Sequence, residues 1–238
     1  MDKIEVILSN SHVNNQMELS EISMINLLQD IEGIHIHSLG SFTKYLRANN
    51  LGVFLTYRQI DVIKKPKFAQ KVILTTYPFN TRATSGFRHI FIYDEDHNPL
   101  VLTTSFGVFV NLANNQVTRL PKEIVETIND QEQDPNVIVL PRKIKVDNNI
   151  HQLLDKVRIR KSHIDRYNHV NNSHYVAFAL NSINEEIKYD RIRAEYLNSF
   201  VLNDVCFIYL AEKTATKTTF TLENDKNEVY AIIEFSEK

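Results

Sequence analysis

The chain has 238 residues, a formal net charge of −2 and 43% hydrophobic residues, and its apolar stretches fall short of the roughly 20 residues of a membrane span. This balance excludes a strongly basic nucleic-acid-binding protein and supports a core of one large domain or two small ones. The single cysteine excludes an internal disulfide.

The first half of the chain predicts helices followed by long strands. Met24, Leu27, Leu28 and Ile31 recur at helical spacing. A second helix is expected over Ser41–Asn50, capped by its first residue and ended near a glycine. Strands are expected at 72–77, 87–93 and 101–110, with a turn at 94–99.

A connector and a second helix–strand pattern follow. Pro121 at a first helical turn predicts a short helix to Ile128, and residues 129–136 are a polar linker. Residues 154–164 predict a strand, in which Val157 and Ile159 alternate with arginines. Val176, Ala179, Leu180 and Ile183 then predict a helix, for which Asn171, Asn172 and Ser173 are all suitable N-caps.

The two halves look related. An offset of 152 carries the four apolar positions of the first helix onto those of the later helix. The strand around Tyr57 resembles the one around Tyr196, and residues 94–100 resemble 223–229 at an offset of 129. The sequence therefore predicts an internal duplication.

One segment joins the second-half strand to its helix and concentrates reactive side chains. It reads Asp165-Arg166-Tyr167-Asn168-His169-Val170-Asn171-Asn172. A carboxylate, an imidazole and free N–H groups at the positive end of a helix suit a reaction that develops an oxyanion. The alternative interpretation of Asp165 and His169 is a helix cap with a hydrogen-bonded turn. An echo at 12–15, His-Val-Asn-Asn, has no Asp at the matching position, so we interpret it as coincidence.

Other chemistries lack support. The five glycines form no phosphate-binding loop, and the sequence has neither a His-Glu-x-x-His motif nor a cysteine pair, so we expect no metal and no cofactor. Cys206 lies in an apolar run, which favours a buried structural thiol over a nucleophile. The N-terminus lacks a basic region followed by an apolar run, so we expect a cytoplasmic protein.

Several short motifs lie along nearly the whole chain. They are Leu55-Thr56-Tyr57-Arg58, Phe91-Ile92-Tyr93-Asp94, Thr104-Ser105-Phe106-Gly107-Val108, Arg119-Leu120-Pro121 and Ser162-His163-Ile164-Asp165, followed by the most specific, Asp-x-x-x-His-Val-Asn-Asn at 165–172. The last motif is similar to that of hot-dog thioesterases in general. With the length of two repeats and the Arg-Leu-Pro connector, the chain resembles the bacterial and plant acyl-acyl carrier protein (acyl-ACP) thioesterases.

The resemblance implies an α+β fold, the tandem (double) hot-dog, in which an antiparallel sheet wraps around a central helix in each half. Residues 1–120 would form the N-terminal half that binds the acyl chain. Residues 121–149 would form the connector helix and linker, and residues 150–238 the catalytic C-terminal half. The implied reaction is hydrolysis of a fatty acyl-ACP thioester by an activated water in fatty acid biosynthesis.

By position, Asp165 and His169 match the catalytic Asp and His of the family. Where the family commonly has Asn, this chain has Tyr167, and the adjacent Asn168 is a candidate for the amide role. Where the family has a catalytic Glu, this chain has Ser199, which could hold a water. These two changes leave a non-catalytic acyl-binding protein as an alternative, besides an acyl-CoA thioesterase of the same fold.

Further residues are expected to bind the substrate or its carrier. Asn171 and Asn172 would lie at the substrate. The expected acyl-chain contacts, for most of which the alternative is a place in the ordinary hydrophobic core, are Met24, Leu28, Leu39, Phe42, Tyr45 and Leu46. The residues expected to dock an acidic carrier protein are Arg142, Lys143, Arg158 and Arg160. A solvated basic surface is the alternative for these four, and a monomer and a homodimer are both compatible with the duplication.

Overall fold

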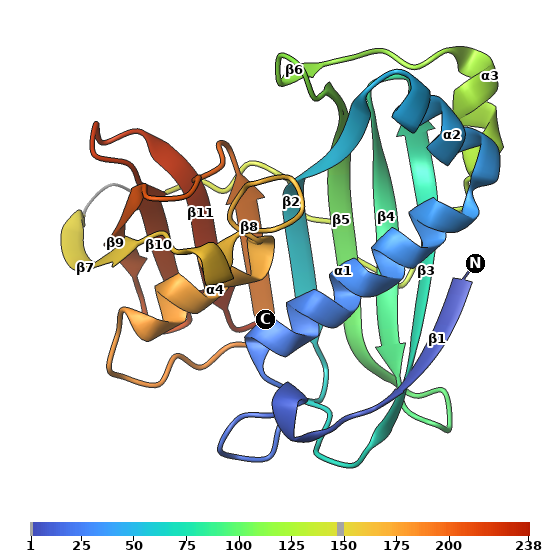
Figure 1. The fold of residues 1–238 in the computed structure, drawn as a ribbon. Coiled ribbons are helices and arrows are strands. Elements are labelled where there is room, and N and C mark those ends of the chain that lie inside the picture. The colour runs from blue at the N-terminus through green and yellow to red at the C-terminus, as the bar shows by residue number, and fades with distance from the viewer. Residues whose placement is uncertain (1, 147–149) are drawn as a thin grey trace.

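A single antiparallel sheet organises the molecule. The computed structural model describes residues 2–146 and 150–238, so the linker end expected at residue 149 lies outside the described residues. The sheet has 11 strands in the order β1-β3-β4-β5-β2-β8-β11-β10-β9-β7, with β6 paired to β5. Figure 1 shows helices α1 and α4 on one face of this sheet.

The elements of the first half are β1 (Asp2–Ile7), η1 (Asn10–His12), α1 (Glu21–Ser38), α2 (Gly40–Ala48), β2 (Leu51–Val62), β3 (Lys71–Arg82), β4 (Ser85–Tyr93), β5 (Pro99–Asn111) and β6 (Gln116–Val117). The connector carries α3 (Lys122–Val125) and η2 (Glu126–Ile128). The elements of the second half are β7 (Gln152–Arg158), η3 (Lys161–His163), α4 (Asn172–Asn181), β8 (Arg191–Tyr196), β9 (Val205–Lys213), β10 (Lys217–Glu223) and β11 (Val229–Ser236).

The two halves share one topology. Along the sheet, β1-β3-β4-β5-β2 in the first half is mirrored by β7-β9-β10-β11-β8 in the second. The halves meet where β2 pairs antiparallel with β8, and Tyr57 lies opposite Glu195. The predicted duplication is therefore present as a repeated order of strands.

The turn before each central helix is built identically. Oδ1 of Asn14 accepts hydrogen bonds from the N–H groups two and four residues later, and Oδ1 of Asp165 does the same. Met17 and Asn168 occupy equivalent left-handed positions, with φ of 62° and 63°. This equivalence corresponds to an offset of 151, so the offset of 152 was wrong by one residue.

The buried faces of the central helices follow the corrected register. In α1, Met24, Ile25, Leu27 and Leu28 are buried. In α4, the residues 151 positions later are buried, namely Tyr175, Val176, Phe178 and Ala179. The turns between paired strands at Asp94 and Asn224 also correspond, at an offset of 130 and not 129, because each side chain accepts the same two backbone N–H groups.

The echo at 12–15 has a different structural partner. Nδ1 of His12 accepts the N–H of Ser9, and Nδ1 of His163 accepts the N–H of Arg160. His12 is therefore structurally equivalent to His163 and not to His169. This confirms that the shared sequence His-Val-Asn-Asn at residues 12–15 and 169–172 is a coincidence.

Several predicted boundaries need correction. The second helix begins at Gly40 and not at Ser41, because the carbonyl of Leu39 already accepts the first helical bond, from Thr43. The strand expected over 154–164 ends at Arg158, since the chain turns into η3. Strand β3, expected to end at residue 77, continues to Arg82, beyond Thr76, the last residue that pairs with β1. Pro78, which has no backbone N–H, therefore lies where β3 has no strand on its β1 side.

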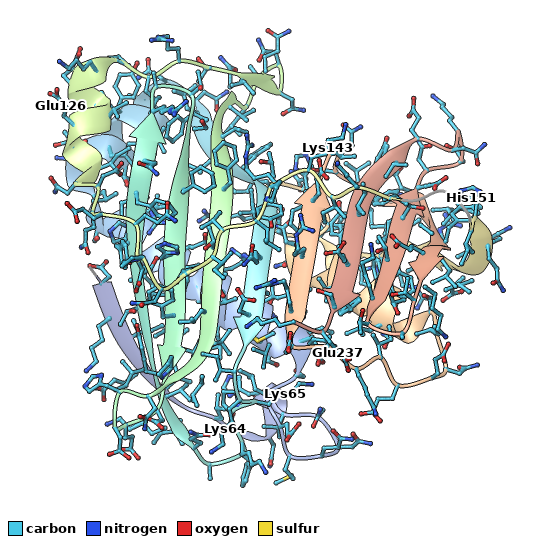
Figure 2. The ribbon with its side chains drawn as sticks, turned by 180° about the vertical axis from the view of Figure 1, so that it is seen from behind. Lys64, Lys65, Glu126, Lys143, His151 and Glu237 are labelled. Carbon is cyan, nitrogen blue, oxygen red and sulfur yellow. The ribbon has the colours of Figure 1, made fainter. Side chains whose placement is uncertain are left out.

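The connector covers the face of the sheet opposite α1. Figure 2 shows it crossing this face, with Lys143 on it. Gln59 of β2 donates to the carbonyl of Ile138 at 2.8 Å and accepts from the N–H of Leu140 at 3.0 Å. Arg193 of β8 donates to the carbonyl of Pro141 at 2.6 Å.

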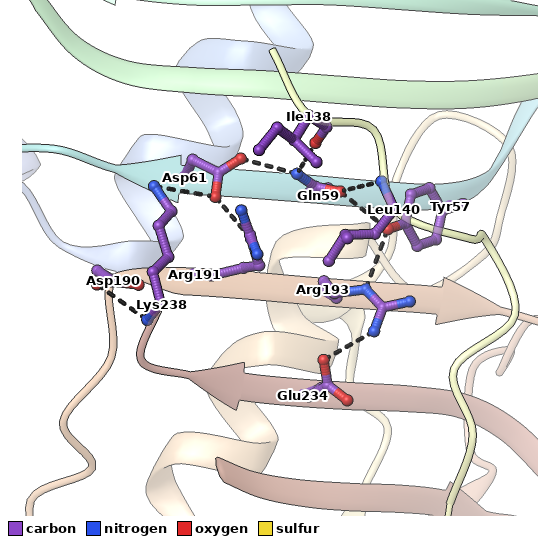
Figure 3. A network of polar contacts seen from close by, with 10 residues as sticks. All are labelled: Tyr57, Gln59, Asp61, Ile138, Leu140, Asp190, Arg191, Arg193, Glu234 and Lys238. Carbon is purple, nitrogen blue, oxygen red and sulfur yellow. Dashed lines mark hydrogen bonds and ion pairs between the residues drawn. The ribbon is translucent and has the colours of Figure 1, made fainter. Parts of the chain in front are cut away.

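The strands at the junction carry a buried ionic network (Figure 3). Arg193 binds Glu234 at 2.8 Å and the hydroxyl of Tyr57 at 3.1 Å. Asp61 of β2 pairs with Arg191 of β8 at 2.6 Å. Because each pair joins different strands, the network fixes the two halves and the connector relative to one another.

The single cysteine of the chain lies in the hydrophobic core. Cys206 is fully buried, as predicted, and burial raises the pKa of its thiol. Across residues 2–146 and 150–238, none of the helices has the length and apolar character to cross a membrane. Over the same ranges, no group of three or more His, Cys, Asp or Glu side chains is arranged to hold a metal ion.

Candidate active site

The loop of residues 165–171 holds its shape through Asp165. The N–H groups of Tyr167 and His169 donate to Asp165 Oδ1 at 2.8 and 3.2 Å, and the N–H of Asp165 donates to the carbonyl of His169 at 2.8 Å. Asn171 ends the loop as the N-cap of α4, where its side chain accepts from the N–H of Ser173. Oδ1 of Asp165 therefore stabilises the turn, as the alternative interpretation of this residue expected. Oδ2 makes no hydrogen bond with the described residues.

A cavity of about 1170 Å³ opens at this loop and is lined by both halves of the chain. The residues predicted from the sequence that line it are Asp165, Tyr167, His169, Asn171, Asn172, Ser199, Leu39 and Phe42. The structure therefore brings most of the predicted catalytic and substrate-contact residues to one cavity, with the expected chemical groups from the second half and apolar walls from the first.

Other predicted residues lie elsewhere. Asn168 is exposed and its side chain does not line the cavity; its left-handed backbone shapes the loop. Met24 and Leu28 are 3% and 0% exposed and belong to the central core beneath α1. Tyr45 and Leu46 pack in the cluster around Phe42, behind the cavity wall.

The His169 ring is held by an aromatic contact from the first half. Phe54 of β2 meets it edge-on, with ring centroids 5.5 Å apart, and meets Tyr167 at the same distance. Arg166 lies over the outer side of the Tyr167 ring, with its guanidinium carbon 4.9 Å from the ring centroid. Tyr167 therefore helps to form the rim of the site.

One backbone N–H remains available at the start of α4. The N–H of Val170 donates to the carbonyl of Phe200, and that of Asn171 donates to the carbonyl of His163, both at 2.9 Å. The N–H of Asn172 makes no hydrogen bond with any described residue. Of the N–H groups of Val170, Asn171 and Asn172, only that of Asn172 is free to bind a ligand.

The central helix of the first half also reaches the site. Nε2 of Gln29 donates to Oδ1 of Asn171 at 3.0 Å. Sequence reasoning missed Gln29, and also Phe54, because a single polar residue on an amphipathic helix and a single aromatic residue on a strand carry no signal of their own. Only the packing of α1 beside the loop reveals them.

Charged residues form one wall deeper in the cavity. Glu32 and Arg88 line it. Arg58, 1% exposed, binds Glu32 and donates from Nε to Ser105 Oγ at 3.1 Å. Burial and the nearby Arg88 lower the pKa of His35 to about 4. Sequence reasoning missed this wall, because a lone charge in a helix, such as Glu32 in α1, or in a strand, such as Arg88 in β4, reads as a solvent-facing residue.

The four predicted docking residues divide between two places. Lys143 lies on the connector, on the face of the sheet opposite α1 (Figure 2). Arg142 precedes it, and the guanidinium carbon of Arg142 lies 3.8 Å from the centroid of the Phe106 ring. Arg158 and Arg160 are exposed at the end of β7, just before the 165–171 loop. They do not form one continuous basic surface.

Comparison with known proteins gives a consistent match. A family model described as the acyl-ACP thioesterase N-terminal domain matches residues 1–128. No curated protein sequence matches the chain. Among solved structures, an acyl-ACP thioesterase from Bacteroides thetaiotaomicron has a TM-score of 0.87 at 20% identity, covering 99% of this chain and 96% of its own.

Two further structures resemble this chain over different lengths. The 12:0-ACP thioesterase from Umbellularia californica has a TM-score of 0.81 at 16% identity, covering 99% of this chain and 96% of its own. A Staphylococcus aureus protein solved in complex with CoA has a TM-score of 0.51 at 10% identity, covering 58% of this chain but 94% of its own. At these identities the likeness concerns the fold.

Proposed function

Since the chain belongs to the acyl-ACP thioesterase family, we propose that it hydrolyses fatty acyl-ACP with Asp165 and His169 as its catalytic residues. The reaction class is thioester hydrolysis, which releases a fatty acid and the free thiol of the carrier. The observation that carries the assignment of residues is the cavity shared by both halves, which has Asp165 and His169 in its wall.

We propose that the architecture is a double hot-dog, in which residues 1–120 and 150–238 form the two repeats and 121–149 connect them. Three observations support this division. The order of strands repeats, the turn before each central helix repeats, and a protein of roughly half the length matches about half of this chain.

The proposed mechanism uses a water held between Asp165 and His169. One of these side chains takes a proton from the water as the oxygen attacks the thioester carbonyl. The N–H of Asn172, at the positive end of α4, stabilises the oxyanion. Acid–base action of this kind supplies roughly 10²–10⁴ in rate, and one oxyanion donor about 10²–10³.

Collapse of the tetrahedral intermediate expels the thiolate, which regains the proton taken from water. A thiol with a pKa near ~8.5 leaves far more readily than an amine, so no nucleophilic serine is needed. Tyr167 and Ser199 replace the usual Asn and Glu of the family. In this proposal Tyr167 shapes the rim and Ser199 holds a water at the cavity.

The acyl chain is proposed to lie in the apolar part of the cavity within the first half. Ile36, Leu39 and Phe42 come from the helices, and Val53 and Val108 from the sheet. Ile36 and Leu39 follow Gln29, the residue of α1 that contacts the 165–171 loop, toward the end of the helix, so a thioester carbonyl at His169 directs the chain into the first half. The acidic carrier would dock from the side of Arg158 and Arg160.

The test is release of free thiol from acyl-ACP and acyl-CoA substrates of graded chain length, beside a His169→Ala control. Hydrolysis that prefers the carrier protein and disappears in the control supports the proposal. Preference for CoA would reassign the carrier. No turnover of any substrate, together with co-purified lipid, would instead identify an acyl-binding protein.

A further inference from the structure

Arg88 is a cation on the cavity wall that has no acidic partner. Its Nη1 contacts Nδ1 of His35 at 2.9 Å and donates to Oγ1 of Thr76 at 3.0 Å. No carboxylate oxygen of the described residues lies within ion-pairing distance of it. Both of its partners are uncharged near neutral pH, since the pKa of His35 is held at about 4.

The nearby carboxylate belongs to another arginine. Glu32 pairs with Arg58, which is almost fully buried and also bound to Ser105. Glu32, Arg58 and Arg88 together leave one positive charge on this wall. Burial lowers the pKa of Arg88, and the carboxylates of Glu32, Asp2 and Asp130 oppose that shift; Asp2 and Asp130 do not line the cavity. The remaining charged residues of the cavity, Asp30, Asp165 and Arg166, lie on α1 beside Gln29 or on the 165–171 loop.

A plain hydrocarbon chain fits this wall poorly. Covering a guanidinium with methylene groups removes its water and returns no hydrogen bond, which is unfavourable. An oxygen substituent would instead accept charge-assisted hydrogen bonds, and a carboxylate could take two of them from the guanidinium fork. Such bonds are shorter and stronger than those between neutral groups.

Resting on the thioesterase function proposed above, we propose that Arg88 binds an oxygen substituent, a hydroxyl or a carboxylate, on the acyl chain of the substrate. The loop reaches α1 at Gln29, and Arg88 reaches it at His35, about 9 Å further along the helix axis at ~1.5 Å per residue. The substituent would therefore be several carbons beyond the thioester.

The test compares acyl-ACPs of one chain length that carry no substituent, a hydroxyl at successive mid-chain positions, or a terminal carboxylate. For the parental protein we expect kcat/KM to be roughly 10-fold to 100-fold higher for at least one substituted chain than for the plain chain. Arg88→Met should bring that ratio to one or below. Arg88→Lys keeps the positive charge but loses the two parallel N–H donors of the guanidinium, so it should retain part of the preference for the substituted chain. Arg119→Met changes an exposed arginine and should retain the full preference.

A plain chain preferred by the parental protein, or a ratio unchanged in Arg88→Met, would overturn the inference while leaving the thioesterase intact. If no thioester is cleaved at all, binding of the corresponding acyl methyl esters, which have no head-group carboxylate, still tests Arg88 alone. Tighter binding of the substituted ester by the parental protein, lost in Arg88→Met, supports the site. Equal binding of the substituted and plain esters overturns it.

Discussion

The side-chain amide of Gln29 in α1 donates to Oδ1 of Asn171, the N-cap residue of α4, over 3.0 Å. The same oxygen accepts from the N–H of Ser173. The central helix of one half thus contacts the residue that starts the central helix of the other, directly beside Asn172. This contact aligns the cavity wall of the first half with the proposed catalytic groups of the second.

Gln29→Leu should therefore weaken catalysis more than stability. One lost hydrogen bond costs about 1 kcal/mol of unfolding free energy, since Asn171 keeps its capping bond. We expect kcat to fall because Asn172 is less well positioned. Denaturant unfolding and thiol release measure the two effects, and an unchanged kcat with a lowered stability would reduce Gln29 to a structural contact.

Asn168 is expected to act through its backbone. Its φ of 63° is favourable for Asn and Gly and costly for a β-branched residue, by about 1–3 kcal/mol. Asn168→Gly should keep the parental rate of thiol release, whereas Asn168→Val should lower the thermal midpoint. A large loss of rate in a well-folded Asn168→Gly protein would show that its amide takes part in the chemistry.

Arg193 should be the most sensitive residue of the junction between the halves. Arg193→Met leaves Glu234 buried without its partner and the carbonyl of Pro141 without its donor, so we expect a loss of about 3–5 kcal/mol. The double variant Arg193→Met/Glu234→Met should recover much of that loss. Urea unfolding tests both, and a loss under about 1 kcal/mol for the single variant would contradict the role of the network.

His35 makes stability depend on pH. Its pKa is about 4 in the folded chain, against an ordinary value of 6.5. Below 6.5 the unfolded chain therefore binds a proton that the folded chain does not. The free energy of unfolding therefore falls as the pH is lowered from about 6.5 to about 4. His35 accounts for a decrease of at most roughly 3 kcal/mol over this range.

His35→Gln should flatten this part of the stability–pH curve, and His37→Gln, at an exposed position of the same helix, should not. Unfolding by urea across this range of pH provides the measurement. Parallel curves for the parental and His35→Gln proteins would rule out His35 as a source of the dependence.

The sequence predicted the elements better than the register between the halves. Apolar spacing located α1 and α4, but only the side-chain bonds of Asn14 and Asp165 show which residues are equivalent, and they differ in residue type. Asp165 and His169 were found because they form a dense local motif. Arg88 of β4 and Glu32 of α1 were not, because a lone charge in a strand or a helix has no sequence signal that distinguishes a cavity wall from solvent.

The same reasoning explains the docking residues. Arg142 and Arg158 are close in sequence, yet the connector crosses the face of the sheet opposite α1 before β7 begins (Figure 2). Which face a connector covers depends on packing of residues such as Val137 against Tyr77 and Phe91, which no local pattern reports.

Asp165→Asn tests the central proposal most directly, because Asn keeps the Oδ1 acceptor of the turn and removes only the charge. Asn14 already supports the equivalent turn in the first half, so the variant should fold, with a thermal midpoint within about 2 °C of the parental value. Asn14→Asp is the matched control and should hydrolyse at the parental rate. We predict that kcat/KM for acyl-ACP falls at least ~100-fold in Asp165→Asn; a folded Asp165→Asn protein that releases thiol at the parental rate would contradict the proposed active site.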